Sequence, residues 1–288
     1  MKKSSRSAFT LVELSVSLII ASIILGMVTQ GIKIVASSRL NAARSITSRS
    51  PVKSISGLVA WYETTSTDSL KKSETDDQKQ ISDWYDISPD SIPAKKNSLI
   101  RIAPSAAVTY ESDGINKLPS IKFNGTNRIE LANFYQGSSS QNTIFIVAKP
   151  SNINTTILDS SSAASATTSI SQNSNSIRLD LGSSVPTGTA TDPVKNLINV
   201  SYIAVIYFNG SSSKAYFNNA LAMAGGSTIN PGNSSLNGLS VGATRNNTTN
   251  YSGLISEIII YNRPLQIQER KDVMSYLSKK YGISVVGI

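Results

Sequence analysis

The chain has 288 residues, enough for one large folded domain or two small ones beside an N-terminal hydrophobic segment. It contains neither cysteine nor histidine, which excludes disulfides, thiol nucleophiles, the usual Cys/His zinc sites and Ser-His-Asp triads. The 27 Lys and Arg residues exceed the 18 Asp and Glu residues, but they are scattered along the chain, so no nucleic-acid partner is expected.

A short basic leader, residues 1–8, precedes a long apolar segment, Phe9–Val35. No charged residue occurs from Leu14 to Ile32, and at the rise of an α-helix this stretch spans about 28 Å, close to the thickness of a bilayer's hydrocarbon core. Basic residues before a membrane span favour the cytoplasmic side. The sequence therefore predicts a single membrane span with a cytoplasmic N-terminus and a body on the other side.

One carboxylate, Glu13, interrupts the apolar segment. A carboxylate within a membrane span costs about 2.5–3.5 kcal/mol on insertion scales, so we expect it to be retained for a function. The residues FTLVEL, which follow the small residue Ala8, resemble the N-terminus of type IV pilins and type II secretion pseudopilins. In that family a prepilin peptidase cuts before the Phe and methylates the new terminus, and the Glu helps subunits to assemble.

The resemblance implies cleavage between Ala8 and Phe9, methylation of Phe9, and an assembly role for Glu13. The family usually has Gly where this chain has Ala8, which is also small. The terminal amine of a neighbouring subunit would supply a positive partner for a carboxylate in hydrocarbon. Two alternatives are a signal peptide, whose apolar core would be shorter and followed by an A-x-A-like site, and a plain anchor, which would not need Glu13.

Helix-compatible residues continue beyond the apolar segment. From Lys33 to Arg49 there is no Gly or Pro, and Pro51 ends the pattern. The sequence predicts one helix of about 40 residues over 9–50, with its first half in lipid and its second half as a stalk. A linker is expected at 51–56.

Short strand patterns follow, rich in Val, Ile, Tyr and Phe and separated by Gly, Pro, Asn and Ser. The segments Ile144–Ala148 and Ile258–Ile260 are apolar on both faces and should be central. Many short strands without intervening helices indicate an antiparallel two-sheet sandwich. Strands are expected at Leu58–Tyr62, Ile81–Tyr85, Ser120–Phe123, Arg128–Leu131, Thr143–Lys149, Thr155–Leu158, Ser176–Leu181, Val200–Phe208, Lys214–Phe217, Leu239–Ala243 and Leu254–Tyr261.

The segment Asp159–Ser176 is a low-complexity run of Ser, Ala, Thr and Asn, which predicts a surface loop or an edge hairpin.

A final helix is predicted over Leu265–Lys280. Apolar residues recur on one face, Gly282 is suited to cap the helix, and Lys279 and Lys280 suit its negative end. One amphipathic helix beside an all-β body is expected to cover its core or an edge.

Several segments of the body resemble a second family. They are GLVAWY from Gly57, ISDWYDIS from Ile81, LPSIKFNGTN from Leu118, TIFIVAKP from Thr143 and LISEIIIYNRPL from Leu254. Together they look like the laminin-G-like or concanavalin A-like lectin/glucanase superfamily. The resemblance covers 57–283, leaves 284–288 as a tail, and implies a jelly-roll sandwich, a fold that hosts sugar binding, sugar cleavage and purely structural roles alike.

Catalysis by a glycosidase of this superfamily needs two carboxylates across the scissile bond. No E-x-D-x-E alternation along one strand occurs, Glu257 stands alone in an apolar strand, and Asp83 and Asp86 would point to opposite faces of a straight strand. The sequence therefore predicts that the chain is not an enzyme.

Sugar binding would use an aromatic platform and polar partners, for which Trp84, Asp86, Asn124 and Asn127 are candidates. The alternative is stronger for two of them, because a Trp in a strand belongs more often to the core and Asn124-Gly125 is typical of a hairpin turn. No cofactor is predicted. Calcium would suit the oxygen ligands, but nothing in the sequence supports it.

The sequence predicts a pilin-like subunit, a pseudopilin or minor pilin, of a bacterial type IV pilus or type II secretion-like filament. Its lectin-like body would lie outside the cytoplasm, for adhesion or glycan binding. The expected partners are other pilin-like subunits, the prepilin peptidase, inner-membrane lipid and a glycan or other surface ligand. A non-polymerising, membrane-anchored carbohydrate-binding module is the alternative, and a surface glycoside hydrolase comes third.

Overall fold

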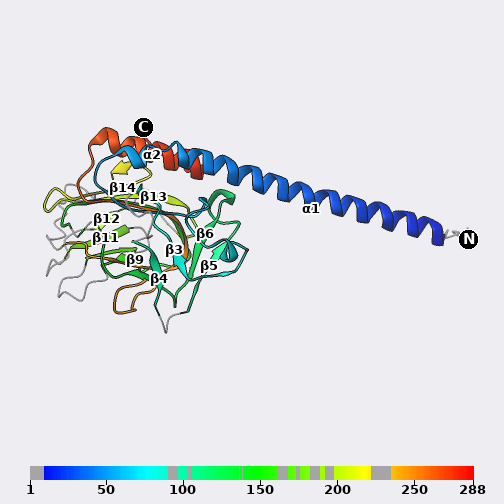
Figure 1. The fold of residues 1–288 in the computed structure, drawn as a ribbon, viewed down its shortest axis with the longest axis horizontal. Coiled ribbons are helices and arrows are strands. Elements are labelled where there is room, and N and C mark those ends of the chain that lie inside the picture. The colour runs from blue at the N-terminus through cyan, green and yellow to red at the C-terminus, as the bar shows by residue number, and fades with distance from the viewer. Residues whose placement is uncertain are drawn as a thin grey trace, which may run out of the picture. The chain divides into compact units, whose positions relative to one another are not determined.

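The computed structural model describes residues 10–89, 97–102, 106–135, 137, 139–160, 168–172, 176–181, 189–191, 198–221 and 235–288. The chain divides into two compact units, Met1–Ala42 and Ala43–Ile288. In its described part the first unit is helical, and the second is a body rich in β-strands (Figure 1). Ala8 and Phe9 lie outside the described residues, so their processing stays a prediction.

One helix, α1 (Leu11–Ser48), forms the described part of the first unit and continues into the second. Its side chains from Leu11 to Val35 are exposed, and its most apolar window has a mean hydropathy of 2.4, so by length and composition it can cross a membrane. Hydroxyl groups here donate back to the helix, as Ser17 does to the Glu13 carbonyl at 2.8 Å, which satisfies them without water. The predicted long helix is confirmed.

The body contains two antiparallel sheets. The strands of the first sheet, in spatial order, are β15 (Ala220–Leu221), β14 (Lys214–Phe217), β13 (Tyr202–Phe208), β8 (Asn142–Pro150), β17 (Ser252–Tyr261), β6 (Ser120–Asn124), β5 (Val108–Glu111) and β2 (Gln80–Ile81), with β1 (Leu58–Glu63) also paired to β17. Those of the second sheet are β12 (Thr189–Thr191), β11 (Ser176–Leu181), β10 (Thr168–Gln172), β9 (Thr155–Asp159), β16 (Leu239–Val241), β7 (Ile129–Leu131), β4 (Leu99–Arg101) and β3 (Asp83–Trp84).

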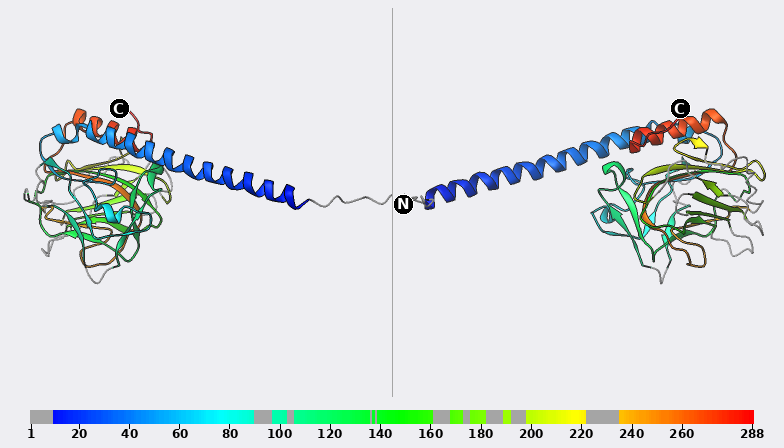
Figure 2. Two further views of the ribbon diagram at one scale, coloured as in Figure 1. Left: turned by 45° about the vertical axis from the view of Figure 1, so that its right-hand side comes forward. Right: turned by 180° about the vertical axis from the view of Figure 1, so that it is seen from behind.

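Along the central strands, successive side chains point to opposite faces of the first sheet, and this gives the body three layers. Ile144 and Ile146 of β8 face the apolar cluster between the two sheets. Phe145 and Val147 belong to a second cluster, which joins the opposite side of the first sheet to α2 (Ile267–Tyr281). Figures 1 and 2 show α2 on that side of the body. Each such buried side chain contributes about 1.5–3 kcal/mol. The expectation that these two-faced apolar strands are central is therefore confirmed.

Two strand predictions are corrected. The low-complexity segment contains β10, which pairs with β9 on one side and β11 on the other, so it is an interior strand and not an edge. Strand β10 contains a single apolar residue, Ile170, which is too little for the sequence pattern to indicate a strand. The strand expected at Ile81–Tyr85 breaks at Ser82, because β2 belongs to the first sheet and β3 to the second.

The short C-terminal helix is confirmed. Gln266 and Glu269 form a capping box at the start of α2, in which the Gln266 backbone N–H donates to Glu269 Oε2 at 2.8 Å. Gly282 ends the helix at φ 60°, a left-handed conformation that glycine adopts without strain.

The residues expected to form a linker pack on the body. They include the short 3-10 helix η1 (Pro51–Ser54), and Val52 is fully buried in the cluster beneath α2. The Tyr261 hydroxyl donates to the Val52 carbonyl at 3.1 Å. Two further 3-10 turns, η2 (Lys72–Glu74) and η4 (Ile115–Lys117), lie in the loops. The jelly-roll topology stays a prediction.

Candidate functional site

The membrane-type helix begins with a hydrogen-bonded acid. The backbone N–H and the hydroxyl of Thr10 both donate to Glu13 Oε2 at 2.9 Å, and the Glu13 N–H donates to Thr10 Oγ1 at 3.2 Å. This reciprocal arrangement is a capping box, and the positive end of the helix dipole favours a carboxylate there. Among the described residues Glu13 has no cationic partner, so its charge is available to a neighbouring group.

In the body, three ionisable side chains meet beneath α2 and form what we term the buried ion cluster: Glu63, Glu257 and Lys280. The antiparallel register of β1 and β17 places Glu63 opposite Glu257. Lys280 Nζ lies 2.8 Å from Glu63 Oε2 and 2.9 Å from Glu257 Oε2. None of the three side chains has exposed surface. Lys280 was expected to interact with the negative end of the helix, but its side chain points into the core. A basic residue in the last turn of a helix does not by itself indicate such burial.

Both carboxylates are fully hydrogen-bonded. Glu257 accepts from the Trp61 indole N–H and the Tyr276 hydroxyl, each at 2.7 Å, and from the Tyr281 hydroxyl at 2.9 Å. Glu63 accepts hydrogen bonds from the segment that follows it, from Thr65 N, Thr65 Oγ1, Ser66 N and Ser69 Oγ. An incompletely paired buried charge costs several kcal/mol, so this complete pairing is what makes the cluster tolerable.

The two acids share one ammonium group unequally. Burial alone would raise the pKa of the Glu63 carboxyl, but Lys280 and the Thr65 hydrogen bonds hold that pKa below its ordinary value. Burial dominates at Glu257, the Glu63 charge adds to it, and the pKa of Glu257 is raised despite Lys280. Burial would lower the pKa of Lys280, but the two carboxylates raise it. Glu257 is therefore the first of the two acids to take up a proton as the pH falls.

The cluster also holds the last turns of α1, which belong to the body unit from Ala43 onward. The Tyr276 hydroxyl, which donates to Glu257, lies 3.4 Å from Thr47 Oγ1. Arg44 Nε donates to the Thr65 carbonyl at 2.7 Å, and Thr65 in turn binds Glu63. Two hydrogen-bonded routes therefore connect the end of α1 with one buried cluster, whose role is structural because no substrate can reach it.

Trp84 and Asp86, two predicted ligand residues, lie inside the fold. Trp84 is fully buried and its indole N–H donates to the Glu63 carbonyl at 2.8 Å. Asp86 Oδ1 accepts from the backbone N–H groups of Trp61 and Ser88, both at 2.8 Å. These contacts tie neighbouring segments together, and neither side chain presents an open face to a ligand.

Asn124 and Asn127 meet at one turn. Asn127 is buried and accepts from the Asn124 backbone N–H at 3.1 Å, whereas Asn124 is exposed and its Oδ1 accepts from Thr126 N at 3.0 Å, as in an Asx turn. The turn joins β6 of the first sheet to β7 of the second, so the expected hairpin is wrong. A ligand-binding role for these residues stays a prediction.

Carboxylates from different strands approach each other on the second sheet. Glu130 of β7 and Asp159 of β9 both pair in register with Ser240 of β16, which lies between them, so about 9.5 Å separates their backbones. Burial raises the pKa of Glu130, Arg128 opposes this rise, and Asp159 adds to it. The two acids lie far apart in the sequence, and only the strand register brings them together.

Metal ligation has little support in the described part of the chain. No group of three or more Asp or Glu residues there is placed to hold a metal ion.

Residues 3–29 match the prokaryotic N-terminal methylation motif. The match covers the basic leader, Glu13 and the first part of α1, and it supports the pilin-like interpretation of this end of the chain. No curated protein matches the chain.

Several solved structures share the fold of the body. Domain 4 of AbnA, a GH43 extracellular arabinanase from Geobacillus stearothermophilus, in complex with arabinotriose, is 16% identical over 76% of this chain and 97% of that one, with a TM-score of 0.50. An arabinofuranosidase complexed with arabinofuranosyl-alpha-1,2-xylobiose is 9% identical over 70% of this chain, with a TM-score of 0.53. The match spans only 51% of the arabinofuranosidase. A mutant of Trypanosoma rangeli sialidase displaying trans-sialidase activity is 12% identical over 87% of this chain and 39% of that one, with a TM-score of 0.50.

These similarities correct two expectations. The neighbours are β-sandwich domains of glycosidases and sialidases, which do not single out the laminin-G-like or concanavalin A-like lectins. The prediction that the chain is not an enzyme is also contradicted, because the fold is one that carbohydrate-active enzymes carry. That prediction relied on carboxylates along a single strand, whereas Glu130 and Asp159 come from two.

Proposed function

We propose that this chain is a pilin-like subunit of a type IV pilus or type II secretion-like filament, and that its body is displayed outside the cytoplasm to bind a glycan. The observation that carries the assembly half is the methylation motif, which overlaps the first part of a helix whose apolar side chains are exposed from Leu11 to Val35. Such a surface needs lipid before assembly and neighbouring helices afterwards. Glu13 would then meet the terminal amine of a neighbour.

The corresponding domain order has a leader at 1–8, an assembly helix at 9–50 that crosses the inner membrane once, and a body from 57 to 283. Mass spectrometry of the chain recovered from bacterial membranes tests the processing step. We expect an N-terminal N-methyl-Phe9, and loss of cleavage in Phe9→Asp. An intact Met1 or a later cut would support the alternative of a membrane-anchored module that does not polymerise.

The glycan half of the proposal is supported by the body's fold. The arabinanase domain was solved with arabinotriose, and the arabinofuranosidase with an arabinofuranosyl xylobiose. We therefore expect the full chain, in detergent micelles, to bind glycans on an array that includes arabinotriose. If the array retains no glycan above background, the proposed glycan binding is wrong, whereas the proposed assembly role is unaffected.

Glycoside hydrolysis is the second candidate, favoured by the partly exposed Glu130 beside the buried Asp159. A carboxyl group with a raised pKa beside a second carboxylate is the arrangement that general acid catalysis uses. The test is release of arabinose from arabinotriose by the full chain and by Glu130→Gln, with Glu111→Gln as a control acid. Turnover that persists unchanged in Glu130→Gln would exclude this pair.

A further inference from the structure

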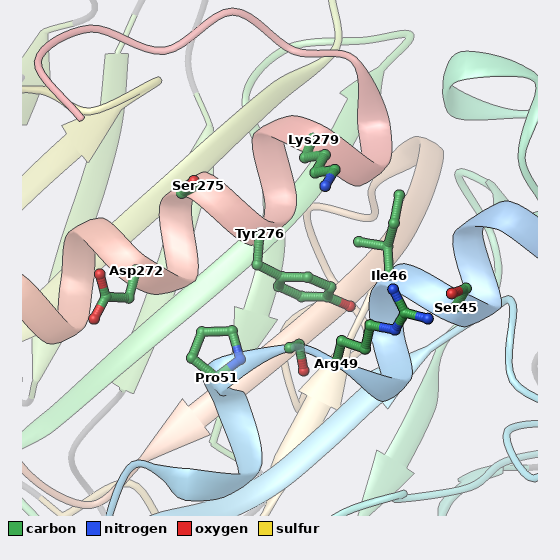
Figure 3. A pocket seen from close by; sticks show the side chains of 9 residues that line it. Ser45, Ile46, Arg49, Pro51, Asp272, Ser275, Tyr276 and Lys279 are labelled. Carbon is green, nitrogen blue, oxygen red and sulfur yellow. The ribbon is translucent and has the colours of Figure 1, made fainter.

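A pocket lies between the end of α1 and α2 within the body unit, with a volume of about 250 Å³. Figure 3 shows Arg49 entering from the α1 side and Lys279 from α2, with Ile46 and the ring of Tyr276 between them. None of the predicted ligand residues lines this pocket, and the assembly proposal does not use it.

The pocket carries two cations without partners. Arg49 and Lys279 are exposed, and neither makes a hydrogen bond or an ion pair with the described residues. Asp272 also lines the pocket, so the formal charge of its side chains is +1. This differs from Lys280, the next residue along α2, whose charge is matched inside the core.

An unpaired hydroxyl gives an independent sign of a ligand. Ser50 lines the pocket, and its Oγ is buried without a hydrogen-bond partner among the described residues. Buried polar atoms are nearly always paired, by protein, water or ligand, so this atom calls for a partner from outside the chain. Ser45 and Ser275 add two exposed hydroxyls to the lining.

We infer that this pocket binds one acidic sugar unit, a uronate, within a glycan. Arg49 and Lys279 hold its carboxylate, Ser50 bonds a ring hydroxyl, and Ile46 and Pro51 contact the apolar face of the ring. A net charge of +1 matches one carboxylate better than a phosphate dianion. The volume lies below the range of about 300–1,000 Å³ for drug-sized ligands, which suits a single ring. The inference rests on the proposed glycan binding and names its ligand class.

Calorimetric titration of the full chain in detergent micelles tests this, with trigalacturonate as the probe and galactotriose, acetate and inorganic phosphate as separate arms. We expect trigalacturonate to bind, and the double variant Arg49→Gln/Lys279→Gln to weaken binding about tenfold. Ser50→Ala should weaken it about threefold without lowering the melting temperature. The charge-matched control is Lys72→Gln/Lys214→Gln, two exposed lysines outside the pocket, and it should bind as the wild type does.

Each other result overturns the inference. Equal losses in the double variant and its control would mean that only overall charge matters. Acetate or phosphate binding as tightly as trigalacturonate would make the site a simple anion site. If galactotriose binds and trigalacturonate does not, the ligand is not a uronate, but the proposed glycan binding stands. If neither sugar binds but N-methyl-Phe9 is present, both the uronate site and the proposed glycan binding are wrong, while the proposed assembly role stands.

A drop in melting temperature with unchanged binding would mean that the two cations serve only the negative ends of the two helices.

Discussion

The two units place their polar and apolar groups in opposite ways. The helical unit exposes its apolar side chains from Leu11 to Val35. The body encloses not only its apolar residues but also Glu63, Glu257 and Lys280. The helix therefore depends on surroundings that the chain does not contain, whereas the body pairs even its buried charges internally. In the proposed assembly the acid in the helix would act between molecules, whereas the acids in the body's core act within one.

The largest effect is expected in the helical unit. Glu13→Ala removes the only acid of the described apolar segment, and we expect cells that produce this variant to lose their filaments while the chain stays in the membrane. Electron microscopy and membrane fractionation measure the two outcomes. Asp68→Ala, an exposed acid of the body, is the control and should leave filaments intact. Normal filaments in Glu13→Ala would show that the acid has no assembly role.

In the body, Lys280→Met should cost about 3–5 kcal/mol of the free energy of unfolding, because it leaves two buried carboxylates without a cation. Denaturant unfolding of the full chain in micelles, followed by near-UV circular dichroism, measures this. Lys279→Met is the matched control, because the adjacent lysine is exposed and should change stability by less than about 0.5 kcal/mol. Equal effects at the two positions would mean that the buried ion cluster is not a source of stability.

A smaller change is expected for Tyr276→Phe, which removes the hydroxyl that joins Glu257 to Thr47. We expect a loss of about 1–3 kcal/mol, because Glu257 loses a buried hydrogen bond. A double-mutant cycle with Thr47→Val isolates the contact with α1, with Ser275→Ala as the surface control on the same helix. A coupling energy of zero would show that the hydroxyl pair does not hold the end of α1.

The smallest effect is in the pH dependence. The lowered pKa of Glu63 gives stability that is present above its unfolded pKa and lost as the pH falls through the folded value. The raised pKa of Glu257 has the opposite sign, and its contribution is lost as the pH rises through its folded value. The two oppose each other on the acid side, so Glu257→Gln should lose stability more steeply than the wild type between about pH 6 and pH 3.

The steepness is read from unfolding curves at several pH values. Identical slopes in Glu257→Gln and the wild type would contradict the assignment. The raised pKa of Lys280 predicts a separate loss of stability on the alkaline side, above the ordinary lysine value of about 10.4.

The sequence was sufficient where one residue type repeats with a clear pattern. The apolar run of α1 and the two-faced apolar strands β8 and β17 were predicted because burial or lipid contact selects such residues throughout an element. The core preference of Trp84 was also anticipated, and this residue is fully buried.

The sequence was insufficient where a position depends on register or on the direction of one side chain. Glu63 meets Glu257 only because β1 and β17 pair, and Glu130 approaches Asp159 only across β16. Lys279 and Lys280 are chemically identical neighbours, yet one is exposed and the other is in the core. The sequence contained these residues, but the partners that define their roles lie far away along the chain.

The hydrogen-bonded routes from the end of α1 have a mechanical meaning. In the proposed filament, tension along the helix would reach the body through Arg44 and Thr47, whose side chains contact it. The Thr47–Tyr276 hydroxyl pair, at 3.4 Å, is longer than the Arg44–Thr65 contact at 2.7 Å and should part first. After that contact opens, Glu257 would still be held by Trp61, Tyr281 and Lys280, so the end of α1 would detach from the body before either sheet separates.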